Sequence, residues 1–516
     1  MSFRNAFTNR VIHPALGFGI ALLFLAAGSM AILAQEPSGG QPSGAPGASD
    51  QNSGAAPAAT GVDTQSEMSE NPPVSGLDQP SFEPGLGARS YIVPKAQVSE
   101  SVTSNPSASV NSTGGVGEIT RLLGAVDLQK LWKIHPLDIS YIGGGAWFHG
   151  GRQTQGWYQV HSMGASQRIL WRTGQLAIRD TFSYLPEGSF GFGSYGGAGG
   201  FGGMGGFGGG VGFGGGGFGG GAFGSPSVGT NGNTPRIDNM GMMDVTQSLS
   251  PRTSVVLLGG YGILHFLNSP PGFVNSEQVI SQVGYNYLLT RKDQIGVSYG
   301  FQEFHFPMAN AGDVNINLWQ VYYARRVSGR LDFTAGGGPQ LIHANGYTLG
   351  LVQLPGGGIG LGLVPLKTSR ISGAGRVGLN YRWSPRTNMA INYFHYVTPG
   401  SGFFPGATTD SVHYLFSHRL TRRWGMDVNT GFSRNSRILN VTSSNSAAGK
   451  SHTYDYWYSG AALRRQLSQQ LQGFVSYQYN KLLFSSGFNA NGSAAGYGQQ
   501  IGTIGISWTG RPIRLD

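Results

Sequence analysis

Residues that could perform catalysis or bind a metal are few in this chain and form no recognisable motif. Cys is absent, which excludes disulfides, thiol nucleophiles and thiolate metal sites. The 11 His residues show no HExxH or related metal-binding spacing. His413 and His418 lie five positions apart in a predicted strand, so their side chains project from opposite faces. The sequence therefore predicts a protein that is not an enzyme, has no cofactor and binds no metal.

Glycine-rich segments match the GxGxxG pattern, for example GMGGFG from Gly203 to Gly208. A phosphate-binding loop also needs a strand before this pattern and a helix after it, and no helix is predicted here. The net charge of +10 would suit nucleic acid as a partner. The glycine-rich run 188–224, however, contains no Lys or Arg that could pair with phosphate. We expect no nucleic-acid partner.

The N-terminus has the three-part layout of a secretory signal peptide over residues 1–34. A basic start with Arg4 and Arg10 precedes an apolar run and the small residues Ala31 and Ala34. An uncleaved anchor helix is the alternative, because the run is long enough to span a membrane. Residues 35–89 are rich in Pro, Ser, Gly and Ala and have almost no apolar periodicity, which predicts a disordered tether.

From residue 90 onward, apolar and polar residues alternate with a period of two. Val279, Val283 and Tyr285 share one face, for example, while Gln278 and Gln282 share the other. Tight connections are predicted at eight places: near His135, Thr173, Pro251, Lys292, Ser328, Pro385, Arg422 and Ser468. Longer segments separate these hairpins, at 186–237, 345–369, 398–410, 434–452 and 485–497. With terminal strands at about 91–103 and 498–510, we predict about 18 strands, within a range of 16–18.

Short turns at one end, long loops at the other and an even strand count are typical of transmembrane barrels. Only 11% of residues are charged, about half the share usual in soluble proteins, so much of the surface must face something other than water. Aromatic residues near strand ends fit interfacial girdles: Trp147, Trp157, Trp171, Trp319, Tyr381, Trp383, Trp424 and Trp508. A soluble β-sandwich is the alternative, but its strands would be shorter.

Residues 90–516 resemble bacterial outer-membrane β-barrels of the porin-like type. The final segment IGTIGISWTGRPIRLD resembles a barrel-closing strand, although eight residues follow Trp508 where most such proteins end on the aromatic residue. The resemblance implies an all-β transmembrane antiparallel barrel in the bacterial outer membrane. Its implied partners are outer-membrane lipid and the barrel-insertion machinery. The sequence does not set the oligomeric state.

Polar side chains within the predicted strands indicate a watery interior. Exposing Arg or Lys to lipid at the bilayer midplane costs roughly 2–4 kcal/mol, so these residues are expected to face the lumen. Internal salt bridges that fill the barrel are the alternative. The candidate lumen-lining residues are Arg179, Asp332, Arg376, Asn380, Arg382, Asp427 and Asn429. Asp180 is an exception, because it shares parity with the apolar residues Ile178 and Phe182. Either a β-bulge turns it inward, or the faces of this strand are assigned the wrong way round.

The segment 186–237 is predicted to be a long glycine-rich outer loop. Three alternatives remain for this loop: it constricts the pore, it adheres to neighbouring molecules outside the cell, or it is a disordered loop without a specific function. Its candidate constriction residues are Phe201, Phe207, Phe213, Phe218 and Phe223.

Two functions therefore remain: a porin-like channel or exporter for a hydrophilic solute, and a structural or adhesive surface protein anchored by the barrel. Export beside surface-polysaccharide machinery is a narrower form of the first.

Deletion of residues 201–224 should leave barrel assembly intact, because loop closure between paired strands depends only weakly on loop length. The variant should migrate like the parent protein on an unheated gel and keep a strand-rich circular dichroism spectrum. Loss of assembly would place this segment in the folded sheet.

Overall fold

The computed structural model describes residues 90–104, 115–132, 134–149, 156–185, 236–267, 274–290, 292–307, 312–353, 359–399, 405–438, 453–485 and 496–515. The predicted signal peptide, the predicted tether and the loop with its five candidate Phe residues lie outside this part of the chain. All regular structure in the described residues is β-strand, and none of them forms a helix that could cross a membrane.

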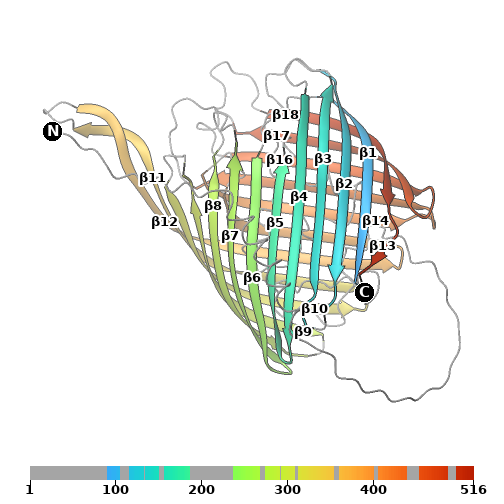
Figure 1. The fold of residues 1–516 in the computed structure, drawn as a ribbon. Coiled ribbons are helices and arrows are strands. Elements are labelled where there is room, and N and C mark those ends of the chain that lie inside the picture. Colours follow the sequence, from blue (N-terminus) through green and yellow to red (C-terminus); the bar gives the residue numbers. More distant parts are fainter. Residues whose placement is uncertain are drawn as a thin grey trace, which may run out of the picture. The chain divides into compact units, whose positions relative to one another are not determined.

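Eighteen long strands and one short strand make up the sheet (Figure 1). The first nine are β1 Tyr91–Thr103, β2 Gly117–Lys130, β3 Leu137–His149, β4 Gly156–Trp171, β5 Gly174–Leu185, β6 Arg236–Ser250, β7 Thr253–Phe266, β8 Ser276–Leu288 and β9 Asp293–His305. The others are β10 Asp313–Ser328, β11 Leu331–Gln353, β12 Ile359–Ser384, β13 Thr387–Thr398, β14 Ala407–Arg419, β15 Trp424–Arg437, β16 Thr453–Gln466, β17 Leu471–Phe484, β18 Gly496–Thr509 and β19 Ile513–Arg514.

Pairing between the first and last long strands closes the sheet into a barrel. Each long strand pairs antiparallel with its neighbours in sequence, and β18 pairs with β1 from Lys95↔Thr509 to Thr103↔Ile501. The short β19 extends this seam through Ile92↔Ile513. Closure leaves no free sheet edge around the wall, so the long strands have partners on both sides there. The outer parts of β11 and β12, after Ala344 and before Gly375, pair only with each other.

The eight predicted tight connections are confirmed. They join β2 to β3, β4 to β5, and so on to β16 and β17, and the shortest span only two residues, such as 172–173 and 329–330. The predicted first and last strands are also confirmed, within two residues at each end. The prediction of an antiparallel barrel of about 18 strands is therefore correct.

The predicted loop 345–369 is wrong, because most of this segment is strand. β11 continues to Gln353 and β12 begins at Ile359, with pairing up to Gln353↔Ile359. In Figure 1 this hairpin extends beyond the ends of its neighbours. Its glycine-rich composition suggested a loop, but the two segments pair with each other, and this pairing between backbone groups does not depend on side chains.

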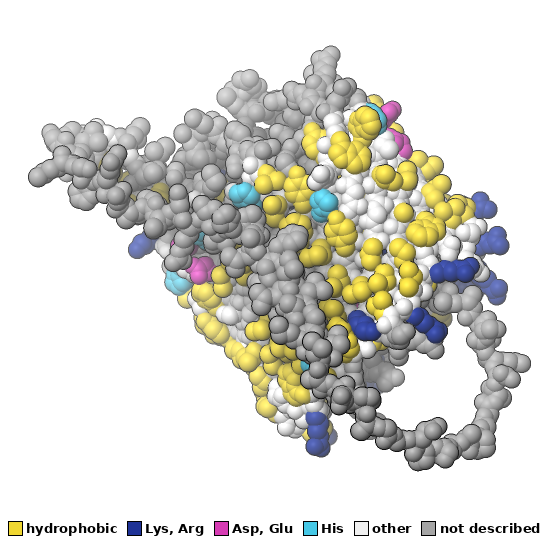
Figure 2. Space-filling view, in the orientation of Figure 1, with side chains coloured by type: hydrophobic (Ala, Val, Ile, Leu, Met, Phe, Trp, Pro, Cys, Tyr) yellow, Lys and Arg dark blue, Asp and Glu magenta, His cyan; other side chains and the backbone are white. Residues whose placement is uncertain are grey.

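The outward face of the barrel is apolar. Along β9, for example, Val297 is 51% exposed and points away from the buried Gln302. Figure 2 shows hydrophobic side chains spread over the visible wall between the two ends. An exposed apolar surface of this extent would be unstable in water and matches the hydrocarbon core of a bilayer.

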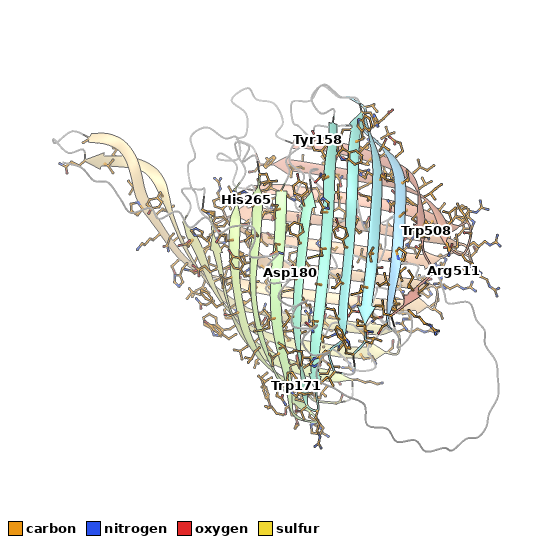
Figure 3. All side chains as sticks on the ribbon, viewed as in Figure 1. Tyr158, Trp171, Asp180, His265, Trp508 and Arg511 are labelled. Atoms are coloured by element: carbon orange, nitrogen blue, oxygen red, sulfur yellow. The ribbon has the colours of Figure 1, made fainter. Side chains whose placement is uncertain are left out.

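The predicted girdle residues project outward. Side chains at least 38% exposed are those of Trp147, Trp157, Trp171, Trp319, Tyr381, Trp383 and Trp508. Trp424, the remaining one, lies under the guanidinium of Arg465, 5.3 Å from the ring centroid. Figure 3 places Trp171 at the short-turn end of its strand. Aromatic rings at this level are suited to the interface between lipid and water.

Charges on the outside of the barrel divide between its two ends (Figure 2). Basic residues occupy the short-turn end, among them Arg172, Arg252, Arg330, Arg386, Arg422 and Arg423. Near the long-loop end the outward side chains include Glu100, Glu118, Glu277, Asp313 and His305. Exposed cations also lie near this end, at Lys367, Arg434 and Lys481, so the long-loop end carries charges of both signs while the short-turn end is mainly basic.

Asp180 keeps its outward position on β5. The pairings of β5 with β4 and β6 run through this residue without a register shift, so no bulge turns it inward. Asn239 of β6 donates a hydrogen bond from Nδ2 to Asp180 Oδ1 at 3.1 Å. Figure 3 shows Asp180 between Trp171 at one end of the wall and His265 toward the other. The amide of Asn239 thus partly compensates a carboxyl group on the lipid-facing side.

Closure through β18 should be essential for assembly. Ile504→Pro removes a backbone donor from a strand that is paired on both sides and should abolish the compact, heat-sensitive form seen on unheated gels. Ile513→Pro is the matched control, because Ile513 is similarly exposed (58% against 62%) but pairs only with β1. Equal assembly of the two variants would contradict the observed seam.

Candidate functional site

The interior of the barrel is formed by alternate residues of every long strand. On β2, Ile119, Arg121 and Leu123 are buried, whereas Leu122 between them is 56% exposed. The same alternation runs through β8, where Gln278 and its inward neighbours alternate with exposed residues. Because side chains alternate across a strand, the buried set faces the lumen and the exposed set faces outward.

Among the described residues, five of the ion pairs between neighbouring strands lie on this inward face, in the half of the barrel next to the short turns. Four have measured nitrogen–oxygen distances: Lys95–Asp127 2.5 Å, Arg179–Asp244 2.7 Å, Arg326–Asp332 3.2 Å and Arg168–Asp138 3.5 Å. The fifth joins Arg464 of β16 to Asp427 of β15. In a partly desolvated lumen such pairs hold their charges together and position the side chains along the wall.

Apolar clusters also occupy the inward face, which the sequence did not predict. One cluster joins β2, β3 and β4 through Ile119, Leu123, Ala125, Ile142, Ala146, Phe148 and Val160. Another includes Met240, Leu258, Ile280, Leu318, Ala374 and Tyr396. Strands in these regions carry apolar residues on both faces, so alternation of polarity gives little signal there. The interior is therefore mixed in character.

Amide side chains form a polar area on the inward face of β8 to β11. Gln278, Gln282, Gln302, Gln320 and Gln340 are each at least 96% buried. Gln340 donates through Nε2 to Ser372 Oγ at 2.8 Å. The side-chain amides of Gln278 and Gln282 lack hydrogen-bond partners within the described part of the chain. Such groups are costly to bury alone and suit contact with a polar solute or water.

Arg376 of β12 is held differently from the paired arginines. Its guanidinium lies over the Tyr322 ring of β10, 4.6 Å from the centroid. The hydroxyl of Tyr322 donates to Gln320 Oε1, and Ser298 Oγ donates to that hydroxyl at 3.2 Å. The ring crosses Gly336 on the intervening strand, where a Cβ atom would collide with it. We call Tyr322, Gly336, Ser298 and Gln320 the tyrosine shelf.

The sequence-predicted lumen residues all lie on the inward-facing parity of their strands. Arg179, Asp332 and Asp427 are members of the ion pairs above. Asn380 lies opposite Asp332 in the β11–β12 ladder, with Arg382 two positions further toward the turn, so the structure brings these three together. Asn429 lies elsewhere, opposite Leu415 and Gly460. Their contribution to a solute path stays a prediction, as does that of the Phe residues in 186–237.

The two histidines considered for metal binding lie on opposite faces, as predicted. His413 is buried and contacts Tyr458 Oη at 2.6 Å and Ser411 Oγ at 2.7 Å. His418 contacts Thr387 Oγ1 on the other face. Within the described residues, no three His, Asp or Glu side chains are grouped so that they could hold a metal ion.

An apolar outward face, inward charges and full closure define an antiparallel β-barrel with the polarity of a membrane-spanning barrel, the fold that the sequence resemblance implied. No protein-family model matches the sequence, and no curated protein matches it.

Solved structures with some similarity include an import receptor and two proteins of Pseudomonas aeruginosa. The open form of the ferric-catecholate import receptor Fiu from E. coli K12 is 12% identical with a TM-score of 0.38, and the match covers 81% of each chain. OpdK from Pseudomonas aeruginosa is 10% identical with a TM-score of 0.38, covering 81% of this chain and 98% of that one. OccK2 from the same organism, in complex with glucuronate, is 7% identical with a TM-score of 0.37, covering 83% and 98%.

The Arg464–Asp427 pair provides a direct test of the inward charge arrangement. Arg464→Leu should lower the free energy of unfolding by about 3 kcal/mol, because it leaves the Asp427 carboxylate largely buried without its partner. The double variant Arg464→Leu/Asp427→Leu should recover most of this loss. Urea unfolding followed by tryptophan fluorescence measures the effect.

Arg465→Leu is the control, because this adjacent arginine faces outward. It should cost less than about 1 kcal/mol. Equal effects of the two single variants would argue against the assigned faces.

Proposed function

We propose that the protein is a passive channel of the bacterial outer membrane for small hydrophilic solutes. The observation that carries the proposal is the division of polarity across the wall: apolar side chains face outward, and ion pairs, arginines and amides face inward. Ionised side chains are expensive on the lipid side of a barrel and are tolerated where water reaches them. A barrel that served only as a membrane anchor could be filled with apolar side chains and would not require these inward charges.

The charge distribution on the rims supports a location in the outer membrane and sets an orientation. Basic residues at the short-turn end suit the anionic phospholipid headgroups of the periplasmic leaflet, to which each Lys or Arg contributes about 1 kcal/mol. The long loops, including 186–237, would then face the cell exterior. Outer-membrane lipid is the principal partner in this arrangement.

The lumen residues have defined roles in this proposal. Arg179, Asp332, Asp427 and their ion-pair partners shape the half of the passage next to the periplasm, while Arg376, Asn380 and Arg382 present donors along β12. Asn429 adds a neutral amide on β15. The Phe residues of 186–237 would narrow the outer entrance if that loop folds inward.

A structural or adhesive role, with the barrel as an anchor, is the second candidate. The observation in its favour is the pair of apolar clusters on the inward face, which would suit a filled interior. Export of surface polysaccharide is a narrower version of the channel, and no contact in the described residues selects it.

Refolded protein should produce stepwise conductance in a planar bilayer, because water and ions would fill a lumen lined by charges. The same sample denatured before addition is the control. Liposome swelling with neutral sugars of increasing size should then define the largest solute that passes. A correctly assembled barrel that stays electrically silent would refute the channel and favour the anchor.

A further inference from the structure

We propose that Arg376 and the tyrosine shelf form a binding site for small oxyanions, carboxylate or phosphate, and that the channel prefers anionic solutes. The preference for anionic solutes rests on the proposed channel function, whereas the binding site itself does not. Its basis is the contrast between Arg376 and the paired cations of the same lumen.

Most inward cations near the short turns are matched by a carboxylate. Lys95, Arg168, Arg179, Arg326 and Arg464 each lie within 4.0 Å of an Asp oxygen. A carboxylate at that distance offsets the positive charge and occupies donors of the guanidinium. These arginines therefore contribute little net attraction for a passing anion.

Arg376 has a neutral aromatic partner instead of a carboxylate in the described part of the chain. The Tyr322 ring stabilises the cation through its face and leaves the charge in place. Guanidinium N–H donors lie in the plane of the group and point away from a ring on which it stacks. Their fork matches the two oxygens of a carboxylate or phosphate.

The shelf is built to hold this guanidinium. Tyr322 is 4% exposed, and its hydroxyl is fixed from two sides by Ser298 and Gln320. Gly336, opposite Arg376 in the β11–β12 ladder, leaves room for the ring to lie across that strand. The arginine is thus positioned by packing, at little entropic cost to a ligand that binds it.

Cationic side chains also outnumber carboxylates on the inward face of the described strands. Cations on this face include Lys95, Arg121, Arg168, Arg179, Arg236, Arg326, Arg370, Arg376, Arg382, Arg437 and Arg464, and the carboxylates are Asp127, Asp138, Asp238, Asp244, Asp332 and Asp427. An excess of one sign within low-dielectric walls raises the local concentration of the opposite ion. The excess of inward cations and the site at Arg376 therefore both favour anionic solutes.

Two measurements test the proposal with Arg376→Gln, Arg376→Lys and the control Arg465→Gln. Arg465 also stacks on an aromatic ring, Trp424, but faces outward. Calorimetric titration of refolded protein with succinate and, separately, with inorganic phosphate should show binding of at least one. Arg376→Gln should weaken that binding about tenfold, which corresponds to about 1.4 kcal/mol. Arg376→Lys should weaken it less, and Arg465→Gln should not change it.

Reversal potentials in a KCl gradient should show a preference for chloride that Arg376→Gln reduces at least about twofold. Unchanged binding and unchanged selectivity in assembled Arg376→Gln protein would overturn the site while leaving the channel standing. Oxyanion binding that depends on Arg376 in a protein that does not conduct would keep the site and refute the channel. Comparison of succinate with phosphate identifies which oxyanion the site accepts.

Discussion

Closure of the backbone hydrogen-bond ladder is the constraint on which the whole structure depends. In a bilayer core no water is available to the N–H and C=O groups of an edge strand, so a sheet must pair its last strand with its first. Here β1 meets β18 over most of its length, and β19 continues the seam at the short-turn end. Closure also fixes which side chains face lipid and which face the lumen, because the pleat alternates along every strand.

The lumen contains both charged and apolar side chains because closure of the barrel gives each strand an inward face that is shielded from lipid. Charges that would be expensive on the outside can be turned inward, where neighbouring strands bring opposite charges within hydrogen-bonding distance, as in the pair Arg326–Asp332. The same inward face accepts apolar residues where they can pack on one another. Asp180 shows the cost of departing from this rule, since its carboxyl group faces outward and, among the described residues, is compensated by an amide from Asn239.

The contact between Tyr322 and Arg376 crosses an intervening strand, so it cannot be predicted from the pairing of two adjacent strands. Tyr322 can reach Arg376 only because the strand between them carries Gly336, which lacks a side chain. The arginine is thereby held by an aromatic face, unlike the arginines that pair with Asp nearer the turns. Gly336 thus lets Arg376 contact a neutral ring, whereas the charges of those other arginines are matched by Asp.

The sequence by itself determined the fold class, the strand count and most strand boundaries. A period of two and the positions of tight turns are local properties, so β8 and its outward residues could be assigned from residue order alone. The hairpin of β11 and β12 was missed because its glycine-rich segment carries little pattern, although its two strands pair with each other as far as Gln353↔Ile359. The inward parity of residues such as Arg376 and Asp427 was also readable. Which strand supplies the partner, Tyr322 in one case and Arg464 in the other, was decided only by the tertiary structure, because register and side-chain reach across strands are not local properties of the chain.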